Sequence, residues 1–315
     1  MIKRFIALSV LIAVMLFSGC SNNVDVKNGT ENAVVFTDDL GRTVTVDSPQ
    51  RVAAFLGSFA EIWYLAGGEI IAAPDDAWED FDLPLSEEAV NLGKINDLSL
   101  EMLFSAAPDF VIASSNIRVD LEWLDTLEDT EITVAYFDVS NFEDYLRMLK
   151  ICTEITGRDD LYQKNGTDIK NKIDDVIGQS RLRVEEKGAP TVLSLRASSS
   201  SVRAKSSEGN VLGEMLSSLG CVNIADSEQS LLENLSIEYI IKCDPDYIFF
   251  VQIGDNAEKS KEKIEAFIAE NPAWSELTAV KEGRVFYMDK RLYNNKPNSR
   301  WGEAYEGLEK ILSEN

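Results

Sequence analysis

Two glutamates occupy the same place in two similar segments of the chain, and their spacing is the first sign of shared chemistry. Glu101 stands two residues after Ser99, and Glu238 stands two residues after Ser236. Each segment continues through Pro-Asp into an apolar run, which predicts a Ser-capped helix followed by a buried strand. A carboxylate in the first turn of an exposed helix can form a bidentate pair with an arginine. A glycosidase also needs two carboxylates, but these must lie about 5 to 10 Å apart. The repeat predicts two separate lobes, and carboxylates at the tips of two lobes are too far apart for that role.

Four basic residues are candidates for binding an anionic ligand. Arg118, Arg196 and Lys205 follow predicted strands, and Arg300 lies at the start of the last predicted helix. The chain has a formal net charge of −24, so cations gathered at one place would offset the charge of an anion. For each residue taken alone, a solvated surface charge is an equally good interpretation. The acidity itself excludes nucleic acid as a partner.

Other candidate contacts follow from the expected architecture, because ligands of two-lobed parallel sheets meet the loops beyond the strand ends. The aromatic ones could pack against a flat ligand, although Trp301, at the start of the last helix, is equally suited to packing between lobes. The remaining candidate ligand-binding residues are Ser58, Phe59, Asp76, Trp78, Ser114, Ser115, Tyr293 and Trp301.

Catalytic and metal chemistry find little support in the sequence. The chain contains no histidine, so the run of serines from Ser198 to Ser201 has no imidazole base, and no G-x-S-x-G or phosphate-binding glycine loop is present. Bare transition-metal capture is also disfavoured. After Cys20, the cysteines Cys152, Cys221 and Cys243 form no metal-binding spacing, and we expect three small buried residues. The sequence therefore predicts a binding protein with no enzyme activity, no cofactor and no metal site.

Strand and helix patterns alternate along the chain, which favours two α/β lobes with mainly parallel sheets flanked by helices. A hairpin is expected over 33–46. The first lobe is expected to contain strands at 52–56, 70–73 and 132–137 and a helix at 58–66. The second lobe is expected to contain strands at 191–195, 201–204 and 284–288 and helices at 211–219, 256–269 and 299–312.

One long helix is expected to join the lobes. Apolar residues recur at helical spacing between 160 and 187, and a helix of that length would run about 40 Å at ~1.5 Å per residue. Gly166 is its weak point, and a helix that begins only at Thr167 is the alternative. The predicted domains are an N-terminal lobe at 34–159, the interlobe helix at 160–187 and a C-terminal lobe at 188–315.

The N-terminus has the pattern of a lipoprotein signal. Lys3 and Arg4 precede an apolar run that ends at Ser18-Gly19-Cys20, so 1–19 is expected to be a signal peptide and 20–33 a flexible tether lipidated on Cys20. An uncleaved membrane anchor is the alternative, and it also leaves the lobes facing outward.

These features together resemble the helix-linked solute-binding proteins of bacterial ABC importers for iron complexes, haem and cobalamin. The resemblance is carried by the segments Asp38 to Val46, Arg51-Val52, Gly57 to Glu61, the two Pro-Asp repeats and Gly283 to Phe286, in this order behind the lipoprotein signal. It implies a monomeric, membrane-anchored, extracytoplasmic protein that delivers its ligand to an ABC permease dimer with its ATPase subunits. It also implies that Glu101 and Glu238 dock onto arginines of that permease.

The resemblance implies a metal chelate as the ligand, and an iron-siderophore is the first expectation because the four candidate cations suit an anionic ferric chelate. Haem or a corrinoid is the alternative. Cobalamin-binding relatives carry tryptophans where this chain has Ile95, Leu232 and Ser114. Haem would need a tyrosine such as Tyr293, or a methionine, as its axial ligand.

Overall fold

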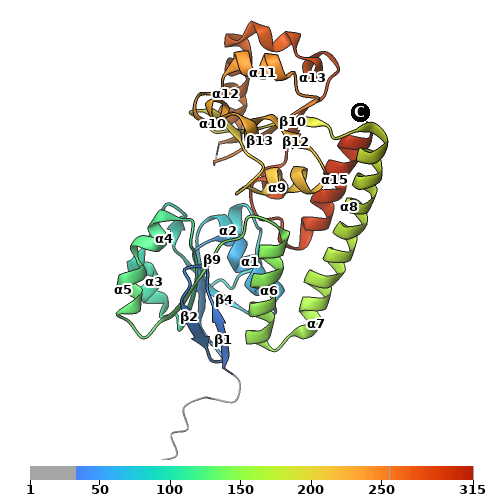
Figure 1. Ribbon diagram of the computed structural model, residues 1–315. Helices are drawn as coiled ribbons and strands as arrows, with labels where there is room; N and C mark the ends of the chain where they lie inside the picture. The colour runs from blue at the N-terminus through green and yellow to red at the C-terminus, as the bar shows by residue number, and fades with distance from the viewer. Residues whose placement is uncertain (1–32, 255, 315) are drawn as a thin grey trace, which may run out of the picture. The chain divides into compact units, whose positions relative to one another are not determined.

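The computed structural model describes residues 33–254 and 256–314, which form two α/β lobes and a connecting helix (Figure 1). The chain enters through an antiparallel hairpin of β1 (Val34–Thr37) and β2 (Thr43–Val46). The Asp38 carboxylate accepts backbone N–H groups of Leu40 and Arg42 in the turn, and Gly41 adopts a φ of +78°. The expected hairpin and its Asp-Asp-Leu-Gly turn are therefore present, because Asp and Gly supply what this turn needs.

The N-terminal lobe is built on a five-stranded parallel sheet of order β5-β4-β3-β8-β9. Its strands are largely buried on both faces, as the continuous apolar runs predict, except for the short edge strand β5. The strands are β3 (Val52–Ala54), β4 (Ile70–Ala73), β5 (Val90–Asn91), β8 (Phe110–Ser114) and β9 (Thr133–Phe137), with a small ribbon of β6 (Gly93–Lys94) and β7 (Asp97–Leu98) beside them. The helices are α1 (Gly57–Leu65), α2 (Asp76–Glu79), α3 (Leu100–Ala106), α4 (Arg118–Glu122), α5 (Leu124–Glu128) and α6 (Phe142–Thr156).

The connecting segment is helical over its whole length, in three parts. Helix α7 (Asp159–Tyr162) runs into a π-helical turn (Gln163–Thr167) and then into α8 (Asp168–Lys187). The π turn contains Gly166, the residue identified as the weak point, and a Cβ there would lie 3.1 Å from a methyl carbon of Leu146. The expected long helix is present, and its irregular turn lies where a small residue lets it pack closely on α6.

The C-terminal lobe has a five-stranded sheet of order β11-β10-β13-β14, with β12 also paired to β10. Strand β11 is antiparallel to β10, and the other pairs are parallel. The strands are β10 (Thr191–Ala197), β11 (Val202–Lys205), β12 (Val222–Asn223), β13 (Tyr247–Gln252) and β14 (Val285–Met288). The helices are α9 (Val211–Ser218), α10 (Gln229–Asn234), α11 (Ile237–Cys243), α12 (Ala257–Glu270), α13 (Thr278–Lys281), α14 (Lys290–Tyr293) and α15 (Trp301–Glu314), with short 3-10 turns at Ile224–Ser227, Pro272–Glu276 and Asn298–Arg300.

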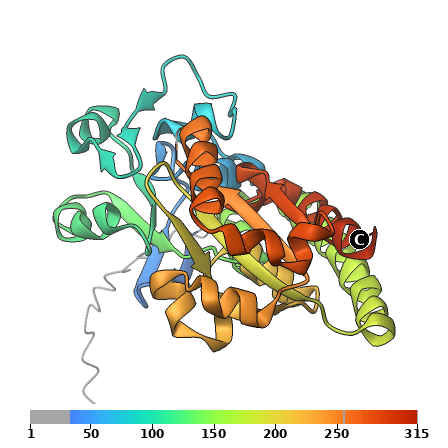
Figure 2. The ribbon, with the colours of Figure 1, turned by 90° about the horizontal axis from the view of Figure 1, so that it is seen from above.

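Helix α8 lies along the last helix, α15, in both ribbon views (Figures 1 and 2). Arg183 on α8 forms a buried ion pair with Glu309 on α15, with 3.0 Å between Nε and Oε1. Arg183 also donates to the carbonyl oxygen of Leu219, so its charge is well satisfied. The connecting helix is thus fixed to the C-terminal lobe and is not a free linker.

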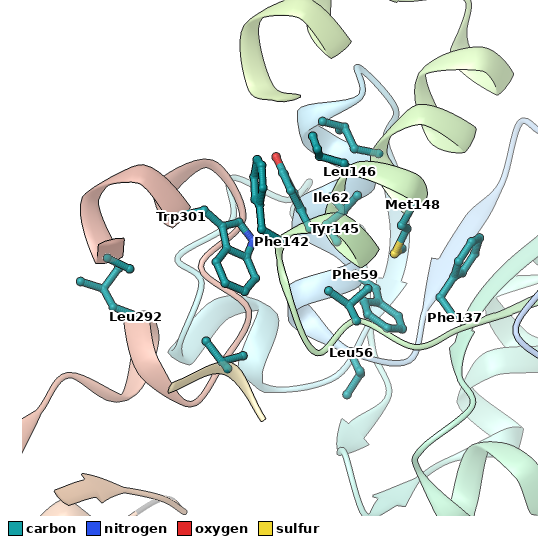
Figure 3. Close-up of a cluster of buried hydrophobic side chains, with 14 of the residues drawn as sticks. Leu56, Phe59, Ile62, Phe137, Phe142, Tyr145, Leu146, Met148, Leu292 and Trp301 are labelled. Carbon is teal, nitrogen blue, oxygen red and sulfur yellow. The ribbon is translucent and has the colours of Figure 1, made fainter. Parts of the chain in front are cut away.

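Trp301, at the start of α15, packs into a core that contains residues of both lobes (Figure 3). Its side chain is fully buried, and its ring lies 5.9 Å from that of Phe142 on α6 in an edge-on arrangement. Of the two roles considered for Trp301, contact with a ligand and packing between the lobes, this arrangement corresponds to packing between the lobes. Of the three cysteines, Cys152 and Cys221 are buried as expected, whereas Cys243 is only partly buried because it ends the surface helix α11.

Trp301→Ala is expected to lower the free energy of unfolding by about 3–5 kcal/mol, because it leaves a large cavity between the lobes. Denaturant unfolding measures this. Trp301→Phe should cost much less, since it keeps a ring in place and removes an indole N–H that has no hydrogen-bond partner. Leu182→Ala, at a 67% exposed position of α8, should change stability by less than about 0.5 kcal/mol. A Trp301→Ala protein as stable as the wild type would contradict a shared core.

Candidate functional site

A buried polar seam joins the two lobes between α1 and the segment that follows α14. Arg291 Nη2 donates to a Glu61 carboxylate oxygen at 2.5 Å, and the two side chains are 14% and 13% exposed. Asn298 Nδ2 donates to the same Glu61 oxygen and to the carbonyl oxygen of Ser58 at 2.9 Å. Burial raises the pKa of Glu61, and the Arg291 charge opposes that rise. The seam joins α1 of the N-terminal lobe to α14 and to the Asn298–Arg300 turn of the C-terminal lobe.

The same arginine holds Lys296 against the N-terminal lobe. Arg291 Nη1 donates to the Lys296 carbonyl oxygen at 2.7 Å, and Lys296 Nζ lies 5.8 Å from the centre of the Phe59 ring. Burial lowers the pKa of Lys296 and the charge of Arg196 adds to this, whereas Asp138 and Asp76 oppose it. Lys296 is therefore a partly buried cation within electrostatic reach of both lobes.

Three further cations share one face of the C-terminal sheet. Arg196 on β10 lies directly opposite Arg203 on β11, and Ser194 lies opposite Lys205. Because opposed residues and residues two apart project to the same side, Arg196, Arg203 and Lys205 lie on a common face. Burial lowers the pKa of Lys205, and the charges of Arg196 and Arg203 lower it further. Burial also lowers the pKa of Arg196.

We refer to Arg196, Arg203, Lys205 and Lys296 as the cation cluster. In residues 33–254 and 256–314, no ion pair joins any of the four to a carboxylate. This is unusual in a chain of net charge −24, where carboxylates are abundant. Like charges opposite each other across strands are destabilising, so the cluster is a surface that an anion would stabilise.

Two of the predicted cations lie elsewhere and have carboxylate partners. Arg118 is paired with Glu122 one turn along α4, and its side chain is 82% exposed. Arg300 is paired with Glu303 at 2.7 Å. Their charges are already balanced by neighbours at helical spacing, so they do not belong to the cation cluster. For Arg118 and Arg300 the structure fits the surface-charge interpretation.

The predicted aromatic contacts are mostly buried. Phe59 is fully buried, and Lys296 Nζ lies over its ring. Tyr293 is 7% exposed, and its hydroxyl donates to the Ala304 carbonyl oxygen at 3.1 Å. Trp301 lies in the core, as described above. Trp78 on α2 is partly buried and packs against the core, so it is the predicted aromatic residue with the most surface to offer a ligand.

The predicted serines and Asp76 lie at the ends of strands. Ser58 is buried at the start of α1, and the backbone N–H of Ser115 donates to a carbonyl oxygen of β9. The Asp76 carboxylate accepts the backbone N–H of Gly57 at 3.0 Å, and burial, assisted by the charge of Asp80, raises its pKa to about 7. Gly57 permits this contact, because a Cβ there would lie 2.6 Å from a backbone atom of α2.

A cavity of about 340 Å³ lies between α2 and the segment after α14. Lys290 crosses it to pair with Asp80 at 2.7 Å, and Gly254 of the C-terminal lobe also lines it. Most of its charged lining is acidic and includes Asp75, Asp76, Glu79, Asp80 and Asp97. The interlobe region therefore offers carboxylates at this cavity and, at the cation cluster, cations that no described carboxylate pairs with. A larger cavity, of about 580 Å³, is lined by the N-terminal lobe alone, between 51 and 90.

Glu101 and Glu238 occupy matching exposed positions in the two lobes. Ser99 and Ser236 each accept, through the side-chain oxygen, the backbone N–H three residues further on. Each Glu lies in the first turn of the helix so capped, and its side chain is exposed. The expected cap and the expected position of the carboxylate are thus both present.

The frameworks behind the two glutamates also match. Helix α3 ends at Ala107 with a φ of +47°, and α11 ends at Asp244 with a φ of +42°. Asp109 and Asp246 then each accept a backbone N–H at the start of the neighbouring strand, at 3.0 Å and 2.7 Å. The sequence repeat is therefore a structural repeat, in which equivalent residues have equivalent environments.

Two members of the cation cluster, Arg203 and Lys296, were not among the residues predicted from the sequence. Arg203 belongs to the strand after Arg196, and antiparallel pairing was the signal that could have found it. Lys296 lies between Tyr293 and Arg300, two of the predicted ligand-binding residues. Cys20 lies outside the described residues, and no described helix is long and apolar enough to cross a membrane.

Comparison with known proteins agrees with this architecture. The family model described as periplasmic binding protein matches residues 52–292, which is more than half of the chain. The chain is 26% identical over 294 residues to the Fe(3+)-citrate-binding protein YfmC of Bacillus subtilis, covering 89% of this chain and 87% of that protein. It is 24% identical over 295 residues to the uncharacterized ABC transporter substrate-binding lipoprotein YvrC of the same organism, covering 89% and 88%.

Solved structures with the same fold include two Staphylococcus aureus proteins. SirA complexed with staphyloferrin B superposes with a TM-score of 0.70 at 17% identity, covering 89% of this chain and 98% of SirA. IsdE complexed with heme superposes with a TM-score of 0.69 at 14% identity, covering 83% and 98%. Together with the two α/β lobes and the helix between them, these matches show that the chain belongs to the periplasmic binding protein family.

Proposed function

We propose that this protein is the solute-binding lipoprotein of an ABC importer and that it captures an anionic ferric chelate between its lobes. The single observation that carries the ligand class is the cation cluster. Four cations that have no carboxylate partner among the described residues, in a strongly acidic chain, leave a positive surface that an anion of several negative charges would neutralise.

The chemistry of ferric chelates suits this surface. Siderophores hold iron through oxygen donors, and carboxylate and catecholate donors leave the complex with net negative charge. Arginine matches a planar carboxylate bidentately, and lysine supplies a compact charge. Arg196 and Lys296 are partly buried, so their contacts with an anion would be less screened than those of fully exposed side chains. The similarity to an Fe(3+)-citrate-binding protein supports the same ligand class.

Haem or a corrinoid is the alternative ligand. The chain has no histidine, and the Tyr293 hydroxyl is already bonded to a backbone carbonyl at a buried position. An axial tyrosine at 293 would therefore need α14 to rearrange. The same lack of histidine argues against an enzyme, because no imidazole can act as base beside a serine or hold a catalytic metal.

Docking and anchoring complete the proposal. Glu101 and Glu238 meet arginines on the two halves of a permease dimer, which is driven by its ATPase subunits. The protein acts as a monomer and is tethered to the outer face of the cell membrane through lipid on Cys20. The similarity to a substrate-binding lipoprotein supports this location.

Tryptophan fluorescence of the purified protein tests the ligand class. We expect ferric citrate or a ferric carboxylate siderophore to quench the fluorescence with saturation, because Trp78 lies on α2, the helix whose residues Asp76 and Glu79 line the interlobe cavity. Iron-free chelators at the same concentration are the control and should have a weaker effect. Saturable quenching by haem or cobalamin alone, together with a tetrapyrrole mass in native mass spectrometry of protein purified from its host, would overturn the ferric-chelate proposal.

A further inference from the structure

Each helix of the structural repeat exposes a large apolar side chain one turn after its glutamate. Phe104 on α3 is 43% exposed, and Ile241 on α11 is 38% exposed. Both stand three residues after Glu101 or Glu238, and residues three apart lie on the same face of a helix. In each lobe, therefore, a carboxylate and an apolar side chain form one small patch on the helix surface (α3 and α11 in Figure 1).

Phe104 and Ile241 also occupy equivalent structural positions in the two lobes. The residues before them, Leu103 and Ile240, are fully buried, so the rotation of each helix is fixed by its own core. The caps and the positive-φ helix ends match, as described above. Phe104 and Ile241 therefore point outward for the same structural reason.

Single exposed apolar side chains are common and need no explanation. Leu182, Val222 and Tyr287 are of this kind, since each is exposed without an equivalent in the other lobe. The repeat pair differs, because it is present twice, beside the same carboxylate, on the same helix. Met102, which is 41% exposed, enlarges the patch on α3.

We propose that Phe104 and Ile241 are the apolar anchors of the permease-docking surface. This inference rests on the proposed function and specifies its partner. The partner is a two-fold membrane protein whose outward face presents, on each half, an apolar pocket beside a cation. The negative charges of Glu101 and Glu238 suit a cationic partner, and one patch in each lobe suits a partner with two equivalent halves.

The two kinds of contact have different physical roles. A charge pair at a polar rim mainly sets the association rate and the register. A large apolar side chain that leaves water in a pocket supplies affinity and slows dissociation. The anchors and the glutamates should therefore be separable by kinetics.

Binding of the purified lipid-free protein to its permease in nanodiscs tests the inference. Phe104→Ala with Ile241→Ala should raise the Kd at least about tenfold, mainly through faster dissociation. Glu101→Gln with Glu238→Gln should instead slow association and weaken its dependence on salt. Phe104→Leu with Ile241→Val should restore most of the affinity. Leu182→Ala is the matched control, because it removes an exposed apolar side chain from α8, and it should leave the Kd unchanged.

The assignment of Phe104 and Ile241 as anchors is overturned if the double variant Phe104→Ala, Ile241→Ala binds the permease as the wild type does. If the glutamine pair then still loses binding, docking by carboxylates stands without the anchors. If neither pair changes binding, these two helices are not the docking surface. The assay needs no chelate, so a failure of the ferric-chelate proposal would appear in the fluorescence titration and would leave this result readable.

Discussion

Replacing Arg196, Lys205 and Lys296 together with Gln is expected to abolish measurable binding of an anionic ferric chelate. Each replacement should cost about 1.5 to 3 kcal/mol where a charged hydrogen bond to the ligand is lost. Each single variant should therefore bind roughly 10- to 150-fold more weakly. Glutamine keeps much of the side-chain length and removes the charge. Fluorescence titration with the chelate that quenches the wild type measures the change.

The effect on stability separates binding from a structural role. In the absence of ligand, Arg196 faces Arg203 across the strands, and neither has a carboxylate partner among the described residues. Removing one of two opposed like charges should leave stability unchanged or raise it slightly. Arg118→Gln is the matched control, because Arg118 is exposed and already paired with Glu122. Normal affinity in the triple variant, or an equal loss in Arg118→Gln, would contradict the assignment of the cation cluster.

The sequence predicts the architecture well because local patterns determine it. Alternating strand and helix signals identify the two sheets, and the apolar stripe between 160 and 187 identifies the connecting helix. The repeat around Ser99 and Ser236 is also local, since the cap, the first-turn carboxylate and the Pro-Asp turn lie within a few residues of one another. Each of these features appears in the structure where the pattern places it.

The composition of the site is harder to predict, because it depends on which charges find partners. Arg118 and Arg196 look alike in the sequence, yet Arg118 has a carboxylate one helical turn away and Arg196 faces another arginine across a strand pair. Helical spacing reveals the first situation, whereas the second requires the strand register. Lys296 depends on the fold even more, since Arg291, which donates to its carbonyl oxygen, is itself paired with Glu61 of the other lobe.

Burial of the aromatic residues was the other obstacle. Phe59 and Trp301 lie near the starts of predicted helices at the expected cleft, and both are fully buried. A residue next to the start of a helix can lie either in the buried core or at the surface of a cleft. Only the packing of Trp301 on Phe142 decides the matter, and these residues are far apart in the sequence.

Replacing both Glu101 and Glu238 with Gln is expected to leave chelate binding intact while uptake into cells falls sharply. Neither carboxylate has an ion-pair partner among residues 33–254 and 256–314, and both are exposed. The double variant with neutral amides should therefore fold normally and lose only its attraction to the permease. Each single variant should give a partial loss, because one lobe still docks. Charge reversal to Lys should be worse than neutralisation, since it places like charges against the permease arginines.

Transport of radioactive iron in cells that carry the double variant measures this, with expression level checked by immunoblot. Glu122→Gln is a suitable control, because it neutralises another exposed carboxylate of the N-terminal lobe, on α4 and away from the repeat. It should transport as the wild type does. Wild-type uptake by the Glu101 and Glu238 double variant would show that these carboxylates only favour the starts of their helices. Loss of chelate binding by the purified double variant would instead show that they act in the fold or in the ligand site, and would remove the case for docking.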